Sequence, residues 1–211
     1  MANLITLTRF LLLFVVLGIA CADPAAWHLV NAPLVILLFV ADGLDGYVAR
    51  RSNTTTRFGA VFDIAADRIV EYSLWVVLAY VHLIHVWVPL LFIVRGGIVD
   101  TIRAAGTEEG LSPFEMMHSA AGRFLVTSGL LRTSYAVIKA ITFAWLLMLQ
   151  PLAEALPELW ASRGEEMEAI GRLLVYCSVV LCLARGLPVI VEFVVQRRGQ
   201  VVPEIDRNKR S

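Results

Sequence analysis

Four aspartates lie close together within an otherwise apolar sequence. Asp42 and Asp45 are three residues apart. Asp63 and Asp67 are four residues apart, so each pair lies on one face of its own helix. A carboxylate in the hydrocarbon core of a bilayer costs about 2.5–3.5 kcal/mol, and a bound cation offsets that cost. Because the cluster offers hard oxygen ligands without histidine or cysteine, it predicts a site for Mg²⁺, Mn²⁺ or Ca²⁺.

Small and basic residues accompany the first pair of aspartates. Gly46 and Ala49 lie on the same side of the expected helix as that pair and leave room for a bulky ligand. Arg50 adds a fixed positive charge, which suits a phosphate group. The segment therefore predicts a divalent-cation site that also holds a phosphorylated ligand.

The spacing of these residues resembles the signature of the CDP-alcohol phosphotransferase family. Every signature position is matched, and eight specified residues at fixed spacing over 26 positions argue strongly against a chance match. The segment reads Asp42-x2-Asp45-Gly46-x2-Ala49-Arg50-x8-Gly59-x3-Asp63-x3-Asp67.

This resemblance implies an enzyme that transfers a phosphatidyl group from CDP-diacylglycerol to the hydroxyl of a small alcohol and releases CMP. It implies two Mg²⁺ or Mn²⁺ ions, which together stabilise the charge of an in-line displacement. By resemblance, Asp42 and Asp63 bridge both ions. Asp45 completes the first metal site, and Asp67 contacts the second. Asp67 is also expected to be the general base toward the acceptor hydroxyl.

The resemblance also assigns the residues that bind the CDP-lipid. Gly46, Arg50 and Thr56 correspond to family positions that contact the cytidine diphosphate group. Thr6 and Thr8 belong to the segment NLITLTR, which resembles the opening of many family members and borders the nucleotide site there.

The composition is that of a membrane protein. Hydrophobic residues make up 58% of the chain and charged residues 17%, and the mean hydropathy is +0.73. These values are too apolar for an ordinary soluble domain. The formal net charge is zero, so overall charge predicts no nucleic-acid partner.

Apolar windows predict an all-α integral membrane protein with six transmembrane helices. We expect a single domain over residues 1–196, followed by a basic cytoplasmic tail over 197–211. The first window also imitates a signal peptide, but it lacks a basic segment in front and contains Arg9. The six windows cover residues 4–22, 29–47, 59–81, 86–104, 124–149 and 169–195.

The charged residues predict the orientation of these helices. Arginine and lysine are concentrated after the second, fourth and sixth windows. In the connections on the opposite side, the charged residues are mostly acidic. By the positive-inside rule, we expect a protein of the inner membrane with both termini and the aspartate site on the cytoplasmic side. The family resemblance also implies a homodimer. We expect the lipid bilayer to be a further partner.

Aromatic residues fall at the predicted outer ends of the helices. Tyr80, Trp87 and Trp160 are examples, and amphipathic rings prefer the membrane interface. His82 and His85 lie at the same level, and we interpret them as interfacial residues.

Arginines in and after the fourth window favour a phosphorylated acceptor. Arg95 and Arg103 are eight residues apart, which is about 12 Å along a helix. An arginine at membrane depth is usually paired or faces a polar cavity. We expect Arg103 and Arg123 to form a cationic acceptor pocket supported by Arg95. Alternatively, Arg95 pairs with Glu71 or Asp100.

Further charged residues lie in the last two windows. Arg132, Tyr135 and Lys139 recur at helical spacing, and they either extend the cationic pocket or pair with acidic residues such as Glu71. In the last window, Arg185 and Glu192 are seven residues apart on one face, which favours a charge pair within the membrane or between helices.

The arginine spacing resembles that of phosphatidylglycerophosphate synthases, whose acceptor is glycerol 3-phosphate. Two positions depart from that pattern, since Gly96 replaces a glutamate and Ile64 replaces a proline. The segment from Arg57 to Arg68 also resembles enzymes that use inositol or inositol phosphate. We therefore expect glycerol 3-phosphate and retain the inositol acceptors as the alternative.

Two other kinds of function are compatible with carboxylates inside a membrane. A cation transporter also carries them, but ion passage does not require Gly46, Ala49, Arg50 and Gly59 at these spacings. A catalytically inactive lipid-binding homologue is the second possibility. It is disfavoured because no signature residue is missing.

Overall fold

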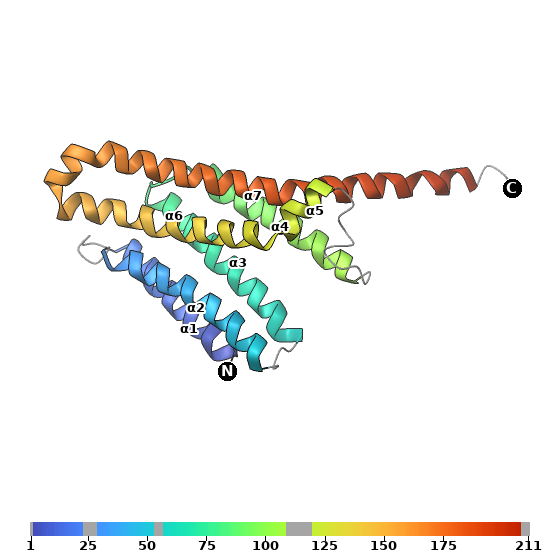
Figure 1. The fold of residues 1–211 in the computed structure, drawn as a ribbon, viewed down its shortest axis with the longest axis horizontal. Helices are drawn as coiled ribbons and strands as arrows, with labels where there is room; N and C mark the ends of the chain where they lie inside the picture. The colour runs from blue at the N-terminus through green and yellow to red at the C-terminus, as the bar shows by residue number, and fades with distance from the viewer. Residues whose placement is uncertain (1, 23–28, 53–56, 109–119, 208–211) are drawn as a thin grey trace. The chain divides into compact units, whose positions relative to one another are not determined.

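The computed structural model describes the backbone of residues 2–22, 29–52, 57–108 and 120–207. The elements in these ranges are α-helices, apart from a 3₁₀ stretch at residues 29–30, and none is a strand, so the predicted all-α class is confirmed for the described part of the chain. In chain order the helices are α1 (Ala2–Ala20), α2 (Asn31–Ser52), α3 (Arg57–Tyr80), α4 (Trp87–Glu108), α5 (Ala120–Thr127), α6 (Gly129–Ala155) and α7 (Pro157–Arg207) (Figure 1).

Each of the six predicted windows falls on a helix, but the fifth window begins in a separate short one. Helix α5 ends before Ser128, whose Oγ accepts a hydrogen bond from the backbone N–H of Leu131 at 3.4 Å. This contact is an N-cap, and it starts α6 as a new helix. Helix α7 begins with Pro157, a favoured first helical residue, and continues to Arg207 through most of the predicted tail.

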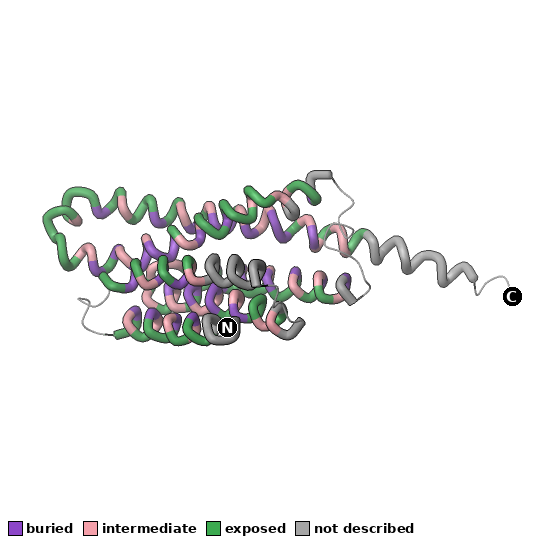
Figure 2. Tube along the Cα trace, turned by 60° about the horizontal axis from the view of Figure 1, so that its bottom comes forward, coloured by how far each residue is buried: buried purple, intermediate pink, exposed green. Residues whose placement is uncertain are grey.

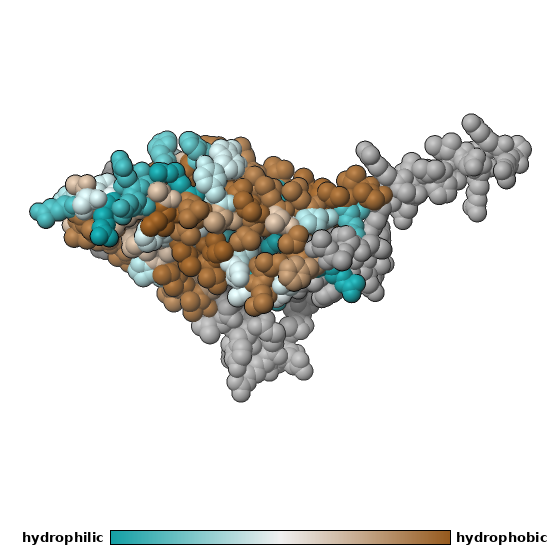
Figure 3. All heavy atoms as spheres, turned by 45° about the horizontal axis from the view of Figure 1, so that its top comes forward, coloured by the Kyte–Doolittle hydropathy of each residue, from teal (hydrophilic) through white to brown (hydrophobic). Residues whose placement is uncertain are grey.

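Apolar length identifies which of these helices can cross a bilayer. Among the described residues, the stretches Gly129–Ala155 and Pro157–Val195 are long and apolar enough, and Leu7–Ala20 and Asn31–Ala41 are shorter apolar helices. Apolar side chains also gather over much of the face shown in Figure 3. A soluble monomer rarely exposes apolar patches of that extent. These features agree with a membrane protein, and the number of spans stays a prediction.

The chain divides into two compact units, which are described separately. The first contains Met1–Leu91 and Val137–Ser178, and the second contains Phe92–Ala136 and Val179–Ser211. Within both units, buried and exposed residues alternate around the helices (Figure 2). This alternation is typical of helices that each pack one face against their neighbours.

In the first unit, α1 lies beside α2 and α3 (Figure 1). Aromatic side chains join α2, α3 and α6 in the core. The Phe143 ring stacks on Phe39, with centroids 5.9 Å apart, and lies 4.5 Å from the Trp75 ring. Such pairs add about 0.5–1.5 kcal/mol beyond the burial of their area. This core fixes the position of α3, which carries two of the four aspartates.

Polar and small residues connect α6 to α7 within the same unit. The hydroxyls of Thr142 and Ser178 lie 3.1 Å apart, and both residues are buried. At Gly171 the helices approach closely, because a Cβ there would lie 3.0 Å from Leu146 Cδ2. Small residues at such positions let two membrane helices pack tightly.

In the second unit, α4 and α7 share a small apolar core. It consists of Val99, Ile102 and Val189, with Ile190 and Phe193 packed against it. The arginines expected to bind the acceptor belong to this unit.

Candidate active site

The four aspartates lie on two successive helices. Asp42 and Asp45 belong to α2, and Asp63 and Asp67 belong to α3. The predicted helical setting is therefore confirmed, and the two spacings place each pair on one helix face. The side chains of Asp42 and Asp45 lie outside the described residues, so the convergence of the four carboxylates stays a prediction.

An arginine from α1 joins the two aspartates of α3. Nη2 of Arg9 donates a hydrogen bond to Oδ1 of Asp67 at 2.9 Å. Nη1 of the same arginine lies 3.8 Å from Oδ1 of Asp63. The Arg9 side chain is only 3% exposed, whereas the two carboxylates are about half exposed. Arg9 thus orients the carboxylates from inside the bundle and leaves their outer sides accessible to a ligand.

Sequence reasoning did not assign Arg9 to the site. Arg9 ends the segment NLITLTR, which borders the nucleotide site by resemblance, and it interrupts the first apolar window, but neither observation gave it a role. A charged residue inside an apolar helix is costly and usually has a buried partner or a function, and that signal was present. The partner itself could not be identified, because Arg9 and Asp67 are 58 positions apart.

A second ion pair lies one helical turn beyond Asp67. Glu71 is buried, and its Oε1 lies 2.8 Å from Nζ of Lys139 on α6. Its Oε2 accepts a hydrogen bond from Nη1 of Arg68 at 3.2 Å. Of the two expectations for Lys139, the ion pair with Glu71 is therefore the one observed. It connects α3 to α6 one helical turn after Asp67.

The donors present fit a divalent cation. Asp63 and Asp67 offer hard, accessible oxygens on one face of α3, which is the ligand type that Mg²⁺ and Mn²⁺ prefer. The described side chains contain no group of three or more potential ligands from His, Cys, Asp and Glu. Two of the four expected ligands, Asp42 and Asp45, fall outside that set.

The residues expected to bind the CDP-lipid are only partly described. Thr8 is exposed on α1, one residue before Arg9. Thr6 lies in α1, and Gly46 and Arg50 lie in α2, but their side chains are outside the described residues. Thr56 is outside them altogether. Their roles remain predictions.

The second unit contains all three arginines expected to bind the acceptor. Arg95 and Arg103 are half-buried on α4, which is helical throughout this stretch, and Arg123 is exposed on α5. In the structure a fourth arginine, Arg185, lies next to Arg95. A Cβ at Gly186 would lie 2.8 Å from Arg95 Cγ, so the Arg95 side chain packs on α7 next to Arg185.

Arg185 lies in a cationic environment. Its side chain is buried, and its guanidinium carbon is 5.9 Å from the centroid of the Tyr135 ring. The positive charges of Arg95 and Arg132 act on it. Among the described residues, Nη1 of Arg185 and Nε of Arg95 are buried without a hydrogen-bond acceptor. Buried donors are normally satisfied, so these two atoms fit the binding of an anion.

Comparison with known proteins extends the resemblance to the whole chain. The model of the CDP-alcohol phosphatidyltransferase family matches residues 1–209. Several curated relatives carry the name CDP-diacylglycerol--glycerol-3-phosphate 3-phosphatidyltransferase. The Wigglesworthia glossinidia brevipalpis protein is 37% identical over 82 residues, which cover 38% of this chain and 45% of the relative.

Two longer matches carry the same name. The Bacillus subtilis protein is 33% identical over 122 residues, which cover 51% of this chain and 63% of the relative. The Shigella flexneri protein is 29% identical over 164 residues, which cover 76% of both chains. The first relatives are thus matched over about half to two thirds of their length. The family match itself covers nearly the whole sequence and includes all eight signature residues, and this chain belongs to the CDP-alcohol phosphatidyltransferase family.

Proposed function

We propose that this protein transfers the phosphatidyl group of CDP-diacylglycerol to glycerol 3-phosphate, giving phosphatidylglycerol phosphate and CMP. The observation that carries the proposal is the Asp63–Asp67 pair, oriented by Arg9 within a complete family signature. The names of the relatives support the acceptor.

The aspartates would hold the metal ions that the reacting pyrophosphate requires. When bound, two Mg²⁺ or Mn²⁺ ions stabilise the charge of the displacement and of the departing CMP. Asp42, Asp45, Asp63 and Asp67 supply the oxygen ligands.

Asp67 takes the proton of the acceptor hydroxyl. Arg9 holds Oδ1 of this carboxylate, whose side chain is about half exposed, and Oδ2 is left for the proton. A carboxylate is a weak base toward an alcohol, and its position therefore matters more than its basicity. The buried Glu71–Lys139 pair supports this position by connecting α3 to α6.

The cytidine diphosphate group is bound from α1 and α2. Thr6 and Thr8 border the nucleotide, Gly46 gives it space, and Arg50 and Thr56 contact its phosphates. The acyl chains of the donor remain in the bilayer, which agrees with the apolar surfaces of these helices.

The arginines of the second unit bind the phosphate of the acceptor. Arg103 and Arg123 form the pocket predicted from the sequence. Arg95 and Arg185 add two buried donors that a phosphate oxygen would satisfy. A guanidinium suits this role because its donors match the geometry of a phosphate.

The enzyme crosses the inner membrane six times, with both termini and the aspartate site on the cytoplasmic side, and works as a homodimer. The clustering of basic residues on alternate connections supports this orientation. The family resemblance supports the dimer.

Comparison of acceptors tests the proposal. Purified protein receives CDP-diacylglycerol and Mg²⁺ or Mn²⁺, with glycerol 3-phosphate, inositol 1-phosphate, inositol or serine in separate reactions. Lipid products are identified by mass. Phosphatidylglycerol phosphate, formed with glycerol 3-phosphate alone, is the expected product. A lipid product formed only with an inositol acceptor would assign that compound, in place of glycerol 3-phosphate, as the acceptor. No CMP with any acceptor, from protein that binds the donor, would reject the transferase assignment.

A further inference from the structure

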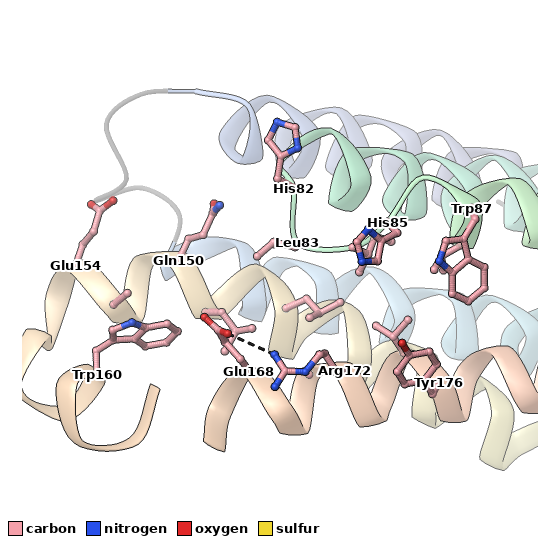
Figure 4. A pocket seen from close by; sticks show the side chains of 17 residues that line it. His82, Leu83, His85, Trp87, Gln150, Glu154, Trp160, Glu168, Arg172 and Tyr176 are labelled. Atoms are coloured by element: carbon pink, nitrogen blue, oxygen red, sulfur yellow. Dashed lines mark hydrogen bonds and ion pairs between the residues drawn. The ribbon is translucent and has the colours of Figure 1, made fainter. Parts of the chain in front are cut away.

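The first unit contains a cavity of about 840 Å³ at the end of α3 that is far from the aspartates (Figure 4). Its walls come from the turn between α3 and α4, the end of α6 and the first half of α7. Tyr80, which ends α3, follows Asp63 by seventeen residues, or about 25 Å along the helix. The volume lies within the usual range of about 300–1,000 Å³ for small-molecule sites. The cavity is therefore separate from the proposed active site.

Both signs of charge line this cavity. Nη1 of Arg172 lies 3.4 Å from Oε2 of Glu168, and the two side chains are 61% and 53% exposed. An ion pair this exposed is weak, so both groups remain accessible to a ligand. Glu154, from α6, is exposed on the wall as well. With two carboxylates and one guanidinium, the wall carries one excess negative charge when its histidines are neutral.

Aromatic rings also line the cavity, next to the charged residues. Trp160 lies beside Glu168, and Tyr176 lies on the other side of Arg172, toward Trp87 (Figure 4). A Cβ at Gly164 would lie 3.0 Å from Cε2 of Trp160, so the absence of a side chain there lets the indole lie against α7. Aromatic faces attract ammonium groups, most strongly those of tryptophan. The end of the cavity near Trp160 thus favours a cation.

The backbone at the rim of the cavity is strained. Helix α3 ends in a Schellman motif, in which the N–H of Leu83 donates to the carbonyl of Leu78 at 3.0 Å. The left-handed position of this motif is usually glycine, but here it is His82, with φ of 61°. Non-glycine residues in this conformation are uncommon, and they cluster at functional sites.

Two other ligand classes fit the cavity poorly. No three potential metal ligands come together among the described side chains, so His82 and His85 do not form a metal site with the glutamates. A purely anionic ligand would meet two carboxylates and one guanidinium, which repel it overall.

We propose that this cavity binds an aminoalkyl phosphate, a zwitterion that carries one ammonium and one phosphate. Arg172 donates charge-assisted hydrogen bonds to the phosphate. Glu154, Glu168 and the Trp160 ring receive the ammonium. The headgroup of a zwitterionic phospholipid has this chemistry, and so does the corresponding soluble phosphodiester. Trp87 and Tyr176 favour the lipid, because half-exposed amphipathic rings are typical of the membrane interface.

Binding to the full-length protein tests this proposal. The protein is placed in nanodiscs of phosphatidylglycerol. The affinities of dihexanoyl phosphatidylethanolamine, glycerophosphoethanolamine and dihexanoyl phosphatidylglycerol are then measured by calorimetry. Glu154→Gln and Arg172→Gln alter the wall. Glu165→Gln and Arg163→Gln make the same charge changes at exposed positions of α7 outside it.

Phosphatidylethanolamine should bind, and its Kd should rise about tenfold in each wall variant, since each loses a charge-assisted contact. The two control variants should bind like the parent protein. Binding of the lipid alone identifies a lipid site, and equal binding of glycerophosphoethanolamine identifies a site for the soluble compound. Binding of phosphatidylglycerol as tight as that of phosphatidylethanolamine would overturn the proposal. Wall variants that match their controls, or no binding of either ethanolamine compound, would do the same.

Discussion

Arg9 on the first helix donates a hydrogen bond to Asp67 on the third helix at 2.9 Å. The arginine is buried, and the carboxylate is about half exposed. A buried cation therefore orients an accessible carboxylate that stands at the last position of the family signature. The proposed mechanism depends on this arrangement, because a general base acts efficiently only when its position is fixed.

Replacing Asp67 with asparagine should separate catalysis from substrate binding. Asp67→Asn removes the proton acceptor and should lower the rate of CMP release by about 10²–10⁴-fold, the usual contribution of a general base. Binding of CDP-diacylglycerol should stay measurable in the same protein preparation. Glu166→Gln, an exposed change of the same kind on α7, serves as the control. Unchanged turnover in Asp67→Asn would show that another group accepts the proton.

Metal binding gives a test of the aspartates that does not require turnover. Asp42→Asn and Asp63→Asn should each weaken Mn²⁺ binding, since both residues are expected to contact two ions. Titration followed by electron paramagnetic resonance of unbound Mn²⁺ measures the affinity directly. Parent-like Mn²⁺ affinity in both variants would place the metal site elsewhere.

Shortening the Arg9 side chain should lower the rate rather than the affinity for the donor. Arg9→Met leaves Asp63 and Asp67 without this cation and their carboxylates less well oriented. The kcat should fall by roughly 100-fold, the cost of a small misplacement of a catalytic group. Arg9→Lys should retain more activity, because it keeps the charge but loses the two-pronged geometry of the guanidinium. Equal rates for Arg9→Met and the parent would mean that Arg9 only stabilises the bundle.

The buried pair between Glu71 and Lys139 should matter for stability. Lys139→Met removes the cation 2.8 Å from a buried carboxylate, and breaking a buried pair typically costs about 3–5 kcal/mol in unfolding free energy. The double variant Glu71→Leu with Lys139→Met should recover much of this loss, because it removes the buried carboxylate together with its buried cation. Arg68 also loses Glu71 in this variant, but its side chain is 26% exposed and can be solvated by water. Denaturant unfolding in detergent measures both effects. A double variant less stable than Lys139→Met would argue against this reasoning.

Gly186 offers a test of the arginine cluster that leaves every arginine in place. Gly186→Ala puts a methyl group against the Arg95 side chain, which must then move. The KM for glycerol 3-phosphate should rise about tenfold, the effect of losing one charge-assisted hydrogen bond, while the KM for the donor stays unchanged. Gly97→Ala on α4 is the matched control, because a Cβ there meets no atom within 4 Å. Equal changes in both KM values would indicate a structural effect.

Arg103→Ala tests the acceptor pocket that the sequence predicts. It should raise the KM for glycerol 3-phosphate much more than the KM for CDP-diacylglycerol. Similar increases for both substrates would assign Arg103 a structural role.

Much of the fold follows from local sequence. Each of the six apolar windows falls on a helix, because length and apolar content define such helices almost alone. The separate short helix α5 was not predicted in this form. Its boundary depends on the cap at Ser128, and such a cap does not interrupt the apolar pattern.

The site was predicted in its residue types but not in its contacts. The positions of the aspartates follow from their spacing and the family signature. The contact between Arg9 and Asp67 depends on the packing of α1 against α3, and the approach of Arg95 to Gly186 depends on α4 and α7. Neither packing is encoded in a short segment. For Arg185 the sequence favours a pair with Glu192, whereas its neighbours Tyr135, Arg95 and Arg132 emerged only from the structure.

Release of CMP from CDP-diacylglycerol by the purified protein tests the central proposal most directly. The reaction is followed with and without glycerol 3-phosphate, and with and without Mg²⁺ or Mn²⁺. Release that requires both the acceptor and the metal is the predicted result. Protein that binds CDP-diacylglycerol and the metal but releases no CMP when glycerol 3-phosphate is present would contradict it.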